Sequence, residues 1–300
     1  MRDSRLTEQR NPKSTKIDKL DVLEIVDLIN NEDRLVAEAV SDERKAIARA
    51  IELVETALRA GGRLIYVGAG TSGRLGVLDA AEMPPTFGID PERVHGVIAG
   101  GYQALVRSQE GAEDHPEDGV EAIDNLDVGQ RDFVLGIATS GSTPYVHGAL
   151  SRARELGART GFLMCTSPPA SLLSEHDVVI APLVGAEVIT GSTRMKAGTA
   201  TKLVLNTITT GAMVRIGKLY SNLMVDLQVT CEKLRDRGER ILSELLNLDQ
   251  PAAAALLDRA SGDVKTALVM AHLDIDAKEA LSRLDAAGGV ISTVIGDLQR

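Results

Sequence analysis

Tryptophan is absent from this sequence, and aromatic residues of all kinds make up only 2% of its 300 positions. This scarcity argues against a surface that binds nucleic acid by stacking bases on aromatic rings. Basic residues are also outnumbered, since 33 lysines and arginines stand against 43 acidic residues and give a net charge of −10. Binding to a phosphate backbone needs a concentrated basic surface, and the basic residues here are scattered. We therefore expect no nucleic-acid partner.

Cysteine and long apolar runs are scarce as well. Cys165 and Cys231 form no C-x-x-C pair, so we expect neither a disulfide framework nor a cysteine zinc site. The five histidines are dispersed and no H-E-x-x-H motif occurs, which predicts no bound metal. No apolar run reaches 18 residues, and the polar start of the chain lacks the apolar core of a secretion signal. The expectation is a cytoplasmic protein without a membrane partner.

The chain does contain short apolar runs that alternate with helical patterns. The five runs cover residues 63–70, 93–101, 132–140, 159–167 and 177–185. Continuous apolar strands that alternate with helices are typical of a parallel sheet covered on both faces. The predicted fold class is therefore α/β, with a doubly wound, five-stranded parallel sheet.

The two ends of the chain have a different pattern. Residues 1–20 are predicted to form an extended polar arm, and apolar residues at helical spacing follow it. The predicted N-terminal helices cover 21–30, 31–40 and 42–59. From about residue 239 onward the sequence has only short helical patterns, which predict a small all-helical domain.

A glycine-rich turn follows the first predicted strand. Gly68, Gly70 and Gly73 have the G-x-G-x-x-G spacing of a dinucleotide-binding turn. Such a site also needs an acidic residue at the end of the second strand, but that strand ends in alanine and glycine here. Thr71 and Ser72 instead stand at a helix start, where unpaired N–H groups favour an anion. The turn therefore indicates a phosphate group rather than NAD.

Two further hydroxyl-rich turns follow later strands, and the second of them opens a long helix predicted over 192–218. Ligands bind at the carboxyl ends of the strands in open α/β sheets, so three such turns at one edge suit a phosphomonoester. For any single turn, a plain loop with a helix N-cap is the alternative. The candidate substrate- and phosphate-binding residues are Gly70, Thr71, Ser72, Gly73, Thr139, Ser140, Gly141, Ser142, Thr143, Ser192, Thr193 and Lys196.

Four stretches of the chain closely resemble the N-acetylmuramic acid 6-phosphate etherase family. They are VGAGTSGRLGVLDAAEMPPTFG (67–88), EGAED (110–114), ATSGSTPYV (138–146) and VGAEVITGSTRMKAGTATKLVLN (184–206). This family belongs to the sugar isomerase (SIS) domain superfamily, and its group includes the vertebrate glucokinase regulatory protein. The resemblance extends from LTEQRNP near the start to LDAAGGVIS near the end. It implies a SIS-type fold.

The resemblance also implies an activity. The family cleaves the lactyl ether of N-acetylmuramic acid 6-phosphate to N-acetylglucosamine 6-phosphate and D-lactate, in the recycling of cell-wall amino sugar. Matched by motif, its two catalytic glutamates fall on Glu82 and Glu113. Because one SIS domain usually pairs with another, the resemblance also implies a homodimer that binds a small sugar phosphate. The predicted domains are an N-terminal arm with helices (1–60), a SIS sugar-phosphate-binding domain (61–220) and a C-terminal helical domain (221–300).

Two carboxyl groups are sufficient for this reaction. Opening the sugar ring exposes an aldehyde at C1, so a base can remove the C2 proton while an acid protonates the lactyl oxygen that leaves C3. Water then adds to the 2,3-unsaturated aldehyde, and no cofactor is required. We assign Glu82 as the acid, because the apolar MPPTF segment after it would raise its pKa, and Glu113 as the base. An exchange of the two roles stays open.

Other interpretations stay open at this point. Without the family match, Glu82 is a surface carboxylate at a helix end, and Glu113 belongs to a solvated acidic run. A non-catalytic sugar-phosphate-binding regulator would use the same hydroxyl-rich turns, although the glucokinase regulatory protein is a longer chain with two SIS domains. An aldose–ketose isomerase of the SIS fold also needs a base at C2. Release of lactate distinguishes an etherase from both.

Overall fold

The computed structural model describes residues 6–226 and 232–296. Cys231 and the two chain ends, on which some of the predictions fall, lie outside the described residues. The chain divides into two compact units, residues 1–81 with 91–210 and residues 82–90 with 211–300. Within the described ranges, no helix is long and apolar enough to cross a membrane.

The first unit is built on one parallel sheet of five strands, in the order β2-β1-β3-β4-β5. The strands are β1 (Leu64–Gly68), β2 (Val94–Ile98), β3 (Phe133–Ile137), β4 (Arg159–Leu163) and β5 (Val178–Ile180). Each of the five predicted apolar runs contains one of them, so the predicted α/β fold is confirmed. The strand order reverses between β1 and β3, which is where such sheets bind ligands at their carboxyl ends.

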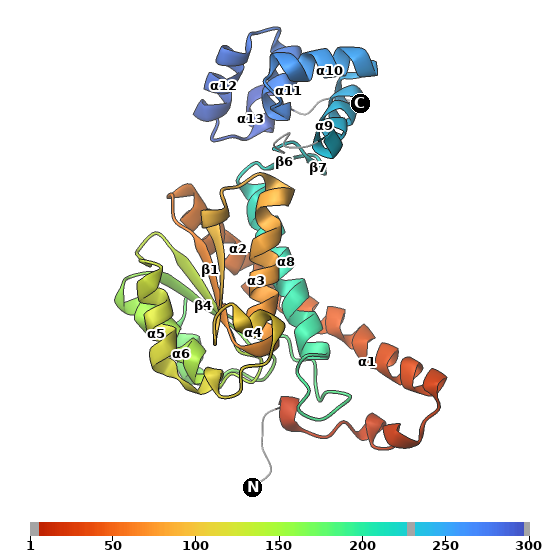
Figure 1. Cartoon of the computed structure of the whole chain (residues 1–300), viewed down its shortest axis with the longest axis vertical. Helices are drawn as coiled ribbons and strands as arrows, with labels where there is room; N and C mark the ends of the chain where they lie inside the picture. Colours follow the sequence, from red (N-terminus) through yellow and green to blue (C-terminus); the bar gives the residue numbers. More distant parts are fainter. Residues whose placement is uncertain (1–5, 227–231, 297–300) are drawn as a thin grey trace. The chain divides into compact units, whose positions relative to one another are not determined.

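Helices cover both faces of the sheet (Figure 1). One face packs on α5 (Pro116–Asn125), α6 (Pro144–Glu155) and α7 (Ala170–Glu175). The other face packs on α2 (Arg44–Arg59), α3 (Gly70–Phe87) and α8 (Lys196–Arg215), and α4 (Gln103–Val106) follows β2. The alternation of side chains along β1 explains both layers. Ile65 and Val67 contribute to the core with α5 and α6, whereas the Tyr66 hydroxyl on the opposite face donates to Asp79 of α3 over 2.8 Å.

The N-terminal part of this unit differs from two predictions. The two helices predicted over 21–30 and 31–40 are one helix, α1 (Val22–Asp42), capped by a reciprocal pair between Asp21 and Glu24. Asn30 and Asn31 do not break it, because asparagine lacks the severe helix penalty of proline. The arm over residues 6–19 is not extended, since it forms three short 3-10 helices. These are η1 (Leu6–Glu8), η2 (Pro12–Ser14) and η3 (Ile17–Lys19).

The acidic stretch after Gly111 contains an element that the sequence pattern did not reveal. It forms η5 (Ala112–Asp114) and then α5, which Pro116 opens at the first helical position. Gly119 and Ile123 are buried, whereas the charged residues of the helix, Glu117, Asp118, Glu121 and Asp124, are exposed. A helix with so narrow an apolar face resembles a solvated loop in the sequence, and packing on α6 stabilises it.

The second unit is almost entirely helical, as predicted, with one short hairpin of β6 (Leu219–Tyr220) and β7 (Leu223–Met224). Its helices after the hairpin are α9 (Glu232–Leu246), α10 (Gln250–Arg259), α11 (Val264–Leu273), α12 (Ala277–Ala286) and α13 (Ile291–Ile295). The core centres on α11, whose residues from Val264 to Met270 are all buried. Aspartates cap three of these helices, at positions 249, 263 and 276.

Candidate active site

A cavity of about 360 Å³ opens where β1 and β3 end, and it is called the hydroxyl cavity here. Its lining residues are Glu8, Ala69, Gly70, Thr71, Ser72, Glu113, Asp114, Ile137, Ala138, Thr139, Ser140, Ser142, Thr143, Pro144, Gly191 and Thr193. The first two predicted hydroxyl-rich turns therefore meet in one place, and Thr193 joins them from the third. None of these described lining residues is a lysine or an arginine.

The positive potential in the hydroxyl cavity comes from helix N-termini, since its described lining has no basic side chain. The hydroxyl cavity includes the start of α3 at Gly70 and the start of α6 at Thr143 and Pro144. Both helices are longer than three turns, so their N–H groups and dipoles favour a doubly charged phosphate. Ser140 and Ser142, whose hydroxyl oxygens lie 3.0 Å apart, add two short donors beside them. The groups in this lining that suit a phosphomonoester are therefore neutral donors and helix N-termini, next to three acidic residues.

The third turn does not offer a helix N-terminus to a ligand. The carboxylate of Glu187, which is fully buried, accepts hydrogen bonds from the backbone N–H groups of Lys196 and Ala197 over 3.0 and 2.9 Å. Burial raises the pKa of Glu187, and these two donors oppose that shift. The start of α8 is thus occupied by a carboxylate of the same chain. Ser192 is not among the residues that line the hydroxyl cavity.

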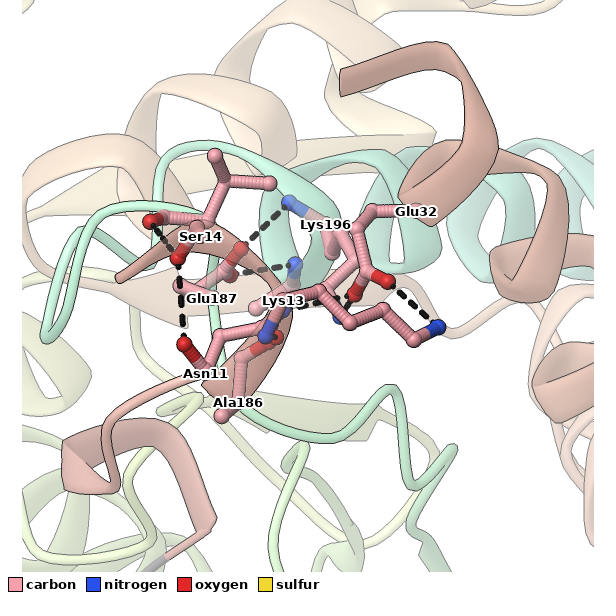
Figure 2. A network of polar contacts seen from close by, with 9 residues as sticks. Asn11, Lys13, Ser14, Glu32, Ala186, Glu187 and Lys196 are labelled. Atoms are coloured by element: carbon pink, nitrogen blue, oxygen red, sulfur yellow. Dashed lines mark hydrogen bonds and ion pairs between the residues drawn. The ribbon is translucent and has the colours of Figure 1, made fainter. Parts of the chain in front are cut away.

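Lys196 does not line the hydroxyl cavity either, and Figure 2 shows it in a network of polar contacts with Glu32. Its side chain is buried, and its Nζ donates to Glu32 Oε2 over 2.8 Å. Lys13 and Asn11 also donate to the Glu32 carboxylate, each over 2.8 Å. Burial would raise the pKa of Glu32, but these donors prevail and lower it from 4.5 to about 2. The structure therefore places Lys196 in a buried ion pair.

Two predicted glycines serve the backbone rather than the cavity lining. Gly73 lies where α3 crosses β1, and a Cβ at this position would lie 2.6 Å from Ile98 Cγ1 and 2.7 Å from the carbonyl oxygen of Gly68. The third glycine of the motif is therefore required for close packing of the helix on the strand. Gly141 is likewise absent from the lining.

Glu113 lies where the hydroxyl cavity meets a second, smaller cavity of about 150 Å³, the side cavity. Both cavities are lined by Ala69, Gly70 and Glu113. Arg74 lines the side cavity, and its Nε donates to the carbonyl oxygen of Leu105 over 3.1 Å. A carboxylate is thus placed between a site with neutral donors and a site with a guanidinium group.

Glu82, the other predicted catalytic residue, lines neither cavity. It lies twelve residues after Gly70 in α3, which corresponds to a rise of about 18 Å at roughly 1.5 Å per residue. Its side chain is exposed, whereas Met83 and Phe87 beside it are buried. Among the described residues, Glu82 therefore does not have the apolar surroundings that were expected around it.

Several lining residues were not predicted as site residues, and Glu8, Asp114 and Gly191 are the ones that lie outside the strands and the hydroxyl-rich turns. Asp114 stands in the acidic run next to Glu113, and Gly191 precedes the third hydroxyl-rich turn without a hydroxyl of its own. Glu8 stands far from every strand in the sequence, and the only signal was its place in the LTEQRNP stretch of the family resemblance. A backbone hydrogen bond from Gly191 to the carbonyl oxygen of Thr7, 3.1 Å long, brings it to the cavity.

Comparison with known proteins identifies the family to which this chain is similar. The family model for the glucokinase regulatory protein N-terminal SIS domain matches residues 46–154. The N-acetylmuramic acid 6-phosphate etherase of Salinibacter ruber is 56% identical over 290 residues, which cover 96% of this chain and 93% of that protein. The protein of the same name from Synechococcus elongatus is 54% identical and covers 97% of this chain and 94% of its own length.

A structural comparison also finds a phosphoheptose isomerase from Francisella tularensis, with a TM-score of 0.46 and 17% identity, over 64% of this chain and 100% of that one. The two etherases match almost end to end, with more than half of the aligned positions identical. On that identity and coverage, this chain belongs to the N-acetylmuramic acid 6-phosphate etherase family.

Proposed function

We propose that this chain cleaves the lactyl ether of N-acetylmuramic acid 6-phosphate and releases N-acetylglucosamine 6-phosphate and D-lactate. In a cell, this reaction recovers the amino sugar of the cell wall. The observation that carries the proposal is Glu113 beside a cavity lined by serine and threonine hydroxyls and two helix N-termini. The names of relatives that are more than 50% identical support it. A doubly charged sugar phosphate does not cross a bilayer unaided, so it stays in the compartment where it is formed. We propose that this compartment is the cytoplasm.

The arrangement suits an elimination followed by an addition. The phosphate at C6 binds between the starts of α3 and α6, which brings C2 and C3 of the ring-opened sugar toward Glu113. Glu113 takes the C2 proton, the C3–O bond breaks, and an acid gives its proton to the departing lactyl oxygen. Water then adds at C3 and returns a proton to C2, with no net oxidation or reduction. The side cavity next to Glu113 has room for the lactyl arm, whose carboxylate would face Arg74.

The direct test is the release of lactate. We expect the purified protein to produce one D-lactate for each N-acetylglucosamine 6-phosphate from N-acetylmuramic acid 6-phosphate, detected with a coupled lactate dehydrogenase assay. A non-catalytic regulator would bind the sugar phosphate without turnover, and an aldose–ketose isomerase would interconvert sugar phosphates without lactate. Either of these outcomes would refute the proposed activity.

We also propose that the active form is a homodimer and that Glu82 acts in the site of the second copy. A side chain about 18 Å along α3 from Gly70 cannot contact a substrate held at the start of that helix. The outer surface of α1 supports an interface, since Val22, Leu23 and Val26 are exposed by 80%, 69% and 47%. A second copy would cover these side chains and supply the apolar surroundings that Glu82 lacks among the described residues.

Mixing two inactive variants tests this sharing of residues. Glu82→Gln and Glu113→Gln are each expected to lose activity, because either change removes one of the two proton-transferring groups. After the two are unfolded together and refolded at equal amounts, half of the dimers are mixed, and each mixed dimer has one intact site if Glu82 acts on the partner's substrate. Activity should then return to about a quarter of the wild-type value. No recovery, with mixed dimers shown by differently tagged chains, would place both glutamates in the same chain's site.

A further inference from the structure

Glu8 lines the hydroxyl cavity together with Glu113 and Asp114, and the proposed reaction assigns no role to Glu8. It ends η1 in the N-terminal arm (residues 6–19), and it is the only residue of that arm in the cavity lining. In the described part of the chain, no hydrogen bond or ion pair occupies its carboxylate. A carboxylate that is held at a cavity without a partner of its own is available to a donor group on a ligand.

The arm that carries Glu8 is fixed to the loop before α8 by three hydrogen bonds. The Asn11 side chain donates to the carbonyl oxygen of Ala186 over 3.2 Å, and the Ser14 hydroxyl donates to that of Val188 over 2.7 Å. Gly191 N–H donates to the carbonyl oxygen of Thr7 over 3.1 Å. The arm therefore follows this loop along its length and ends at the cavity.

The ion network around Glu32 holds the same arm (Figure 2). Glu32 of α1 accepts from Asn11 and Lys13 of the arm and from Lys196 of α8. Asn11 is thus shared between the Glu32 carboxylate and the loop that it fixes. Asn11, Glu32 and Lys196 are buried, and hydrogen bonds among buried groups favour one position of the arm over many.

The backbone at the end of this loop is shaped to admit the Glu8 carboxylate. Gly191 has φ +76°, a conformation that side-chain-bearing residues rarely adopt, and a Cβ there would lie 3.2 Å from Glu8 Oε2. Glycine at this position therefore permits both the turn and the close approach of the carboxylate. The arm, the loop before α8 and Gly191 therefore together place the Glu8 carboxylate at the hydroxyl cavity.

We propose that Glu8 contacts the substrate, with its carboxylate accepting a hydrogen bond from a donor of the sugar moiety, a hydroxyl or the acetamido N–H, and that the Asn11–Glu32–Lys196 network positions it. A carboxylate repels the phosphate, so its partner is the sugar. This inference rests on the proposed function only in taking the ligand to be a 6-phosphorylated amino sugar. Glu8 then selects sugar phosphates over phosphate alone.

Binding of N-acetylglucosamine 6-phosphate and of inorganic phosphate separates this role from others. We expect Glu8→Ala to weaken binding of N-acetylglucosamine 6-phosphate about 10-fold or more, because a hydrogen bond to a charged acceptor is lost. Binding of inorganic phosphate should be unchanged or tighter, since a negative charge is removed. Asp18→Asn, which removes an exposed carboxylate elsewhere in the same arm, is the matched control and should bind both ligands as the wild type does. Calorimetry on the folded proteins measures all of these affinities.

The positioning network has its own readout. Asn11→Ala should weaken binding of N-acetylglucosamine 6-phosphate in the wild-type background, but should have little further effect in Glu8→Ala, because the two residues act through one contact. Equal affinity for N-acetylglucosamine 6-phosphate in wild type and Glu8→Ala, or an equal loss of inorganic phosphate binding, would overturn the proposal. If the wild type binds this sugar phosphate through Glu8 but releases no lactate, the proposed activity fails and the role of Glu8 stands.

Discussion

Glu113→Gln is expected to reduce lactate release by about 10²- to 10⁴-fold, the usual contribution of a positioned acid or base. Glutamine keeps the size of the side chain between the two cavities but cannot accept the C2 proton. The same variant should therefore lose exchange of the C2 hydrogen in deuterated water, which follows the first step independently of lactate. Nuclear magnetic resonance of the sugar in deuterated water measures this exchange.

Two comparisons make this result specific to Glu113. Asp118→Asn changes another exposed carboxylate of the same acidic run that does not line a cavity, and should keep wild-type activity. Glu82→Gln should lose lactate release but keep some exchange at C2, because removal of the proton precedes protonation of the leaving oxygen. Exchange that survives in Glu113→Gln and disappears in Glu82→Gln would reverse the two assigned roles.

Glu32→Ala is expected to cost about 3–5 kcal/mol of folding free energy, the usual price of leaving a buried charge unpaired. The Lys196 side chain is 2% exposed and would lose the carboxylate that its Nζ contacts over 2.8 Å. The melting temperature should fall on the order of 10 °C, as measured by thermal unfolding. Glu52→Ala, which breaks an ion pair between exposed side chains of α2, should lower it much less.

The double variant Glu32→Met with Lys196→Met distinguishes an unpaired charge from lost packing. It removes both charges together and should be markedly more stable than Glu32→Ala. If the double variant is as unstable as the single one, the cost comes from the lost hydrogen bonds of the arm.

The same carboxylate makes stability depend on pH in the acid range. Because the pKa of Glu32 is lowered from 4.5 to about 2, its contribution is present above about 4.5 and is lost as pH falls toward 2. The difference in melting temperature between wild type and Glu32→Gln should therefore shrink over that interval. A difference that stays constant down to pH 2.5 would contradict the low pKa.

The sequence predicted the sheet correctly because each strand is a short apolar run that ends in a glycine- or hydroxyl-rich turn. Those turns also predicted the edge at which Thr71, Ser140 and Thr193 meet, since the carboxyl ends of parallel strands share one edge. Helices with a clear apolar face were found in the same way. α5 was missed because its acidic surface hid a narrow buried stripe, and the break between residues 30 and 31 was wrong because asparagine is tolerated within a helix. The predicted domain boundaries near residues 60 and 220 stay a prediction.

By itself, the sequence determined which residues form strands, where the hydroxyl-rich turns stand between them and which family the motifs resemble. Only the tertiary structure decided which polar groups line the cavity and which are paired within the fold. Lys196 stands next to hydroxyl residues in the sequence, but its partner Glu32 lies 164 positions earlier. Glu8 stands far from every turn, but the arm brings it to the cavity. The physical reason is that patterns of apolar residues involve a few neighbouring positions and can be recognised in the sequence. The hydrogen-bond or ion-pair partner of a charged side chain is whichever group the folded chain brings within about 3 Å of it.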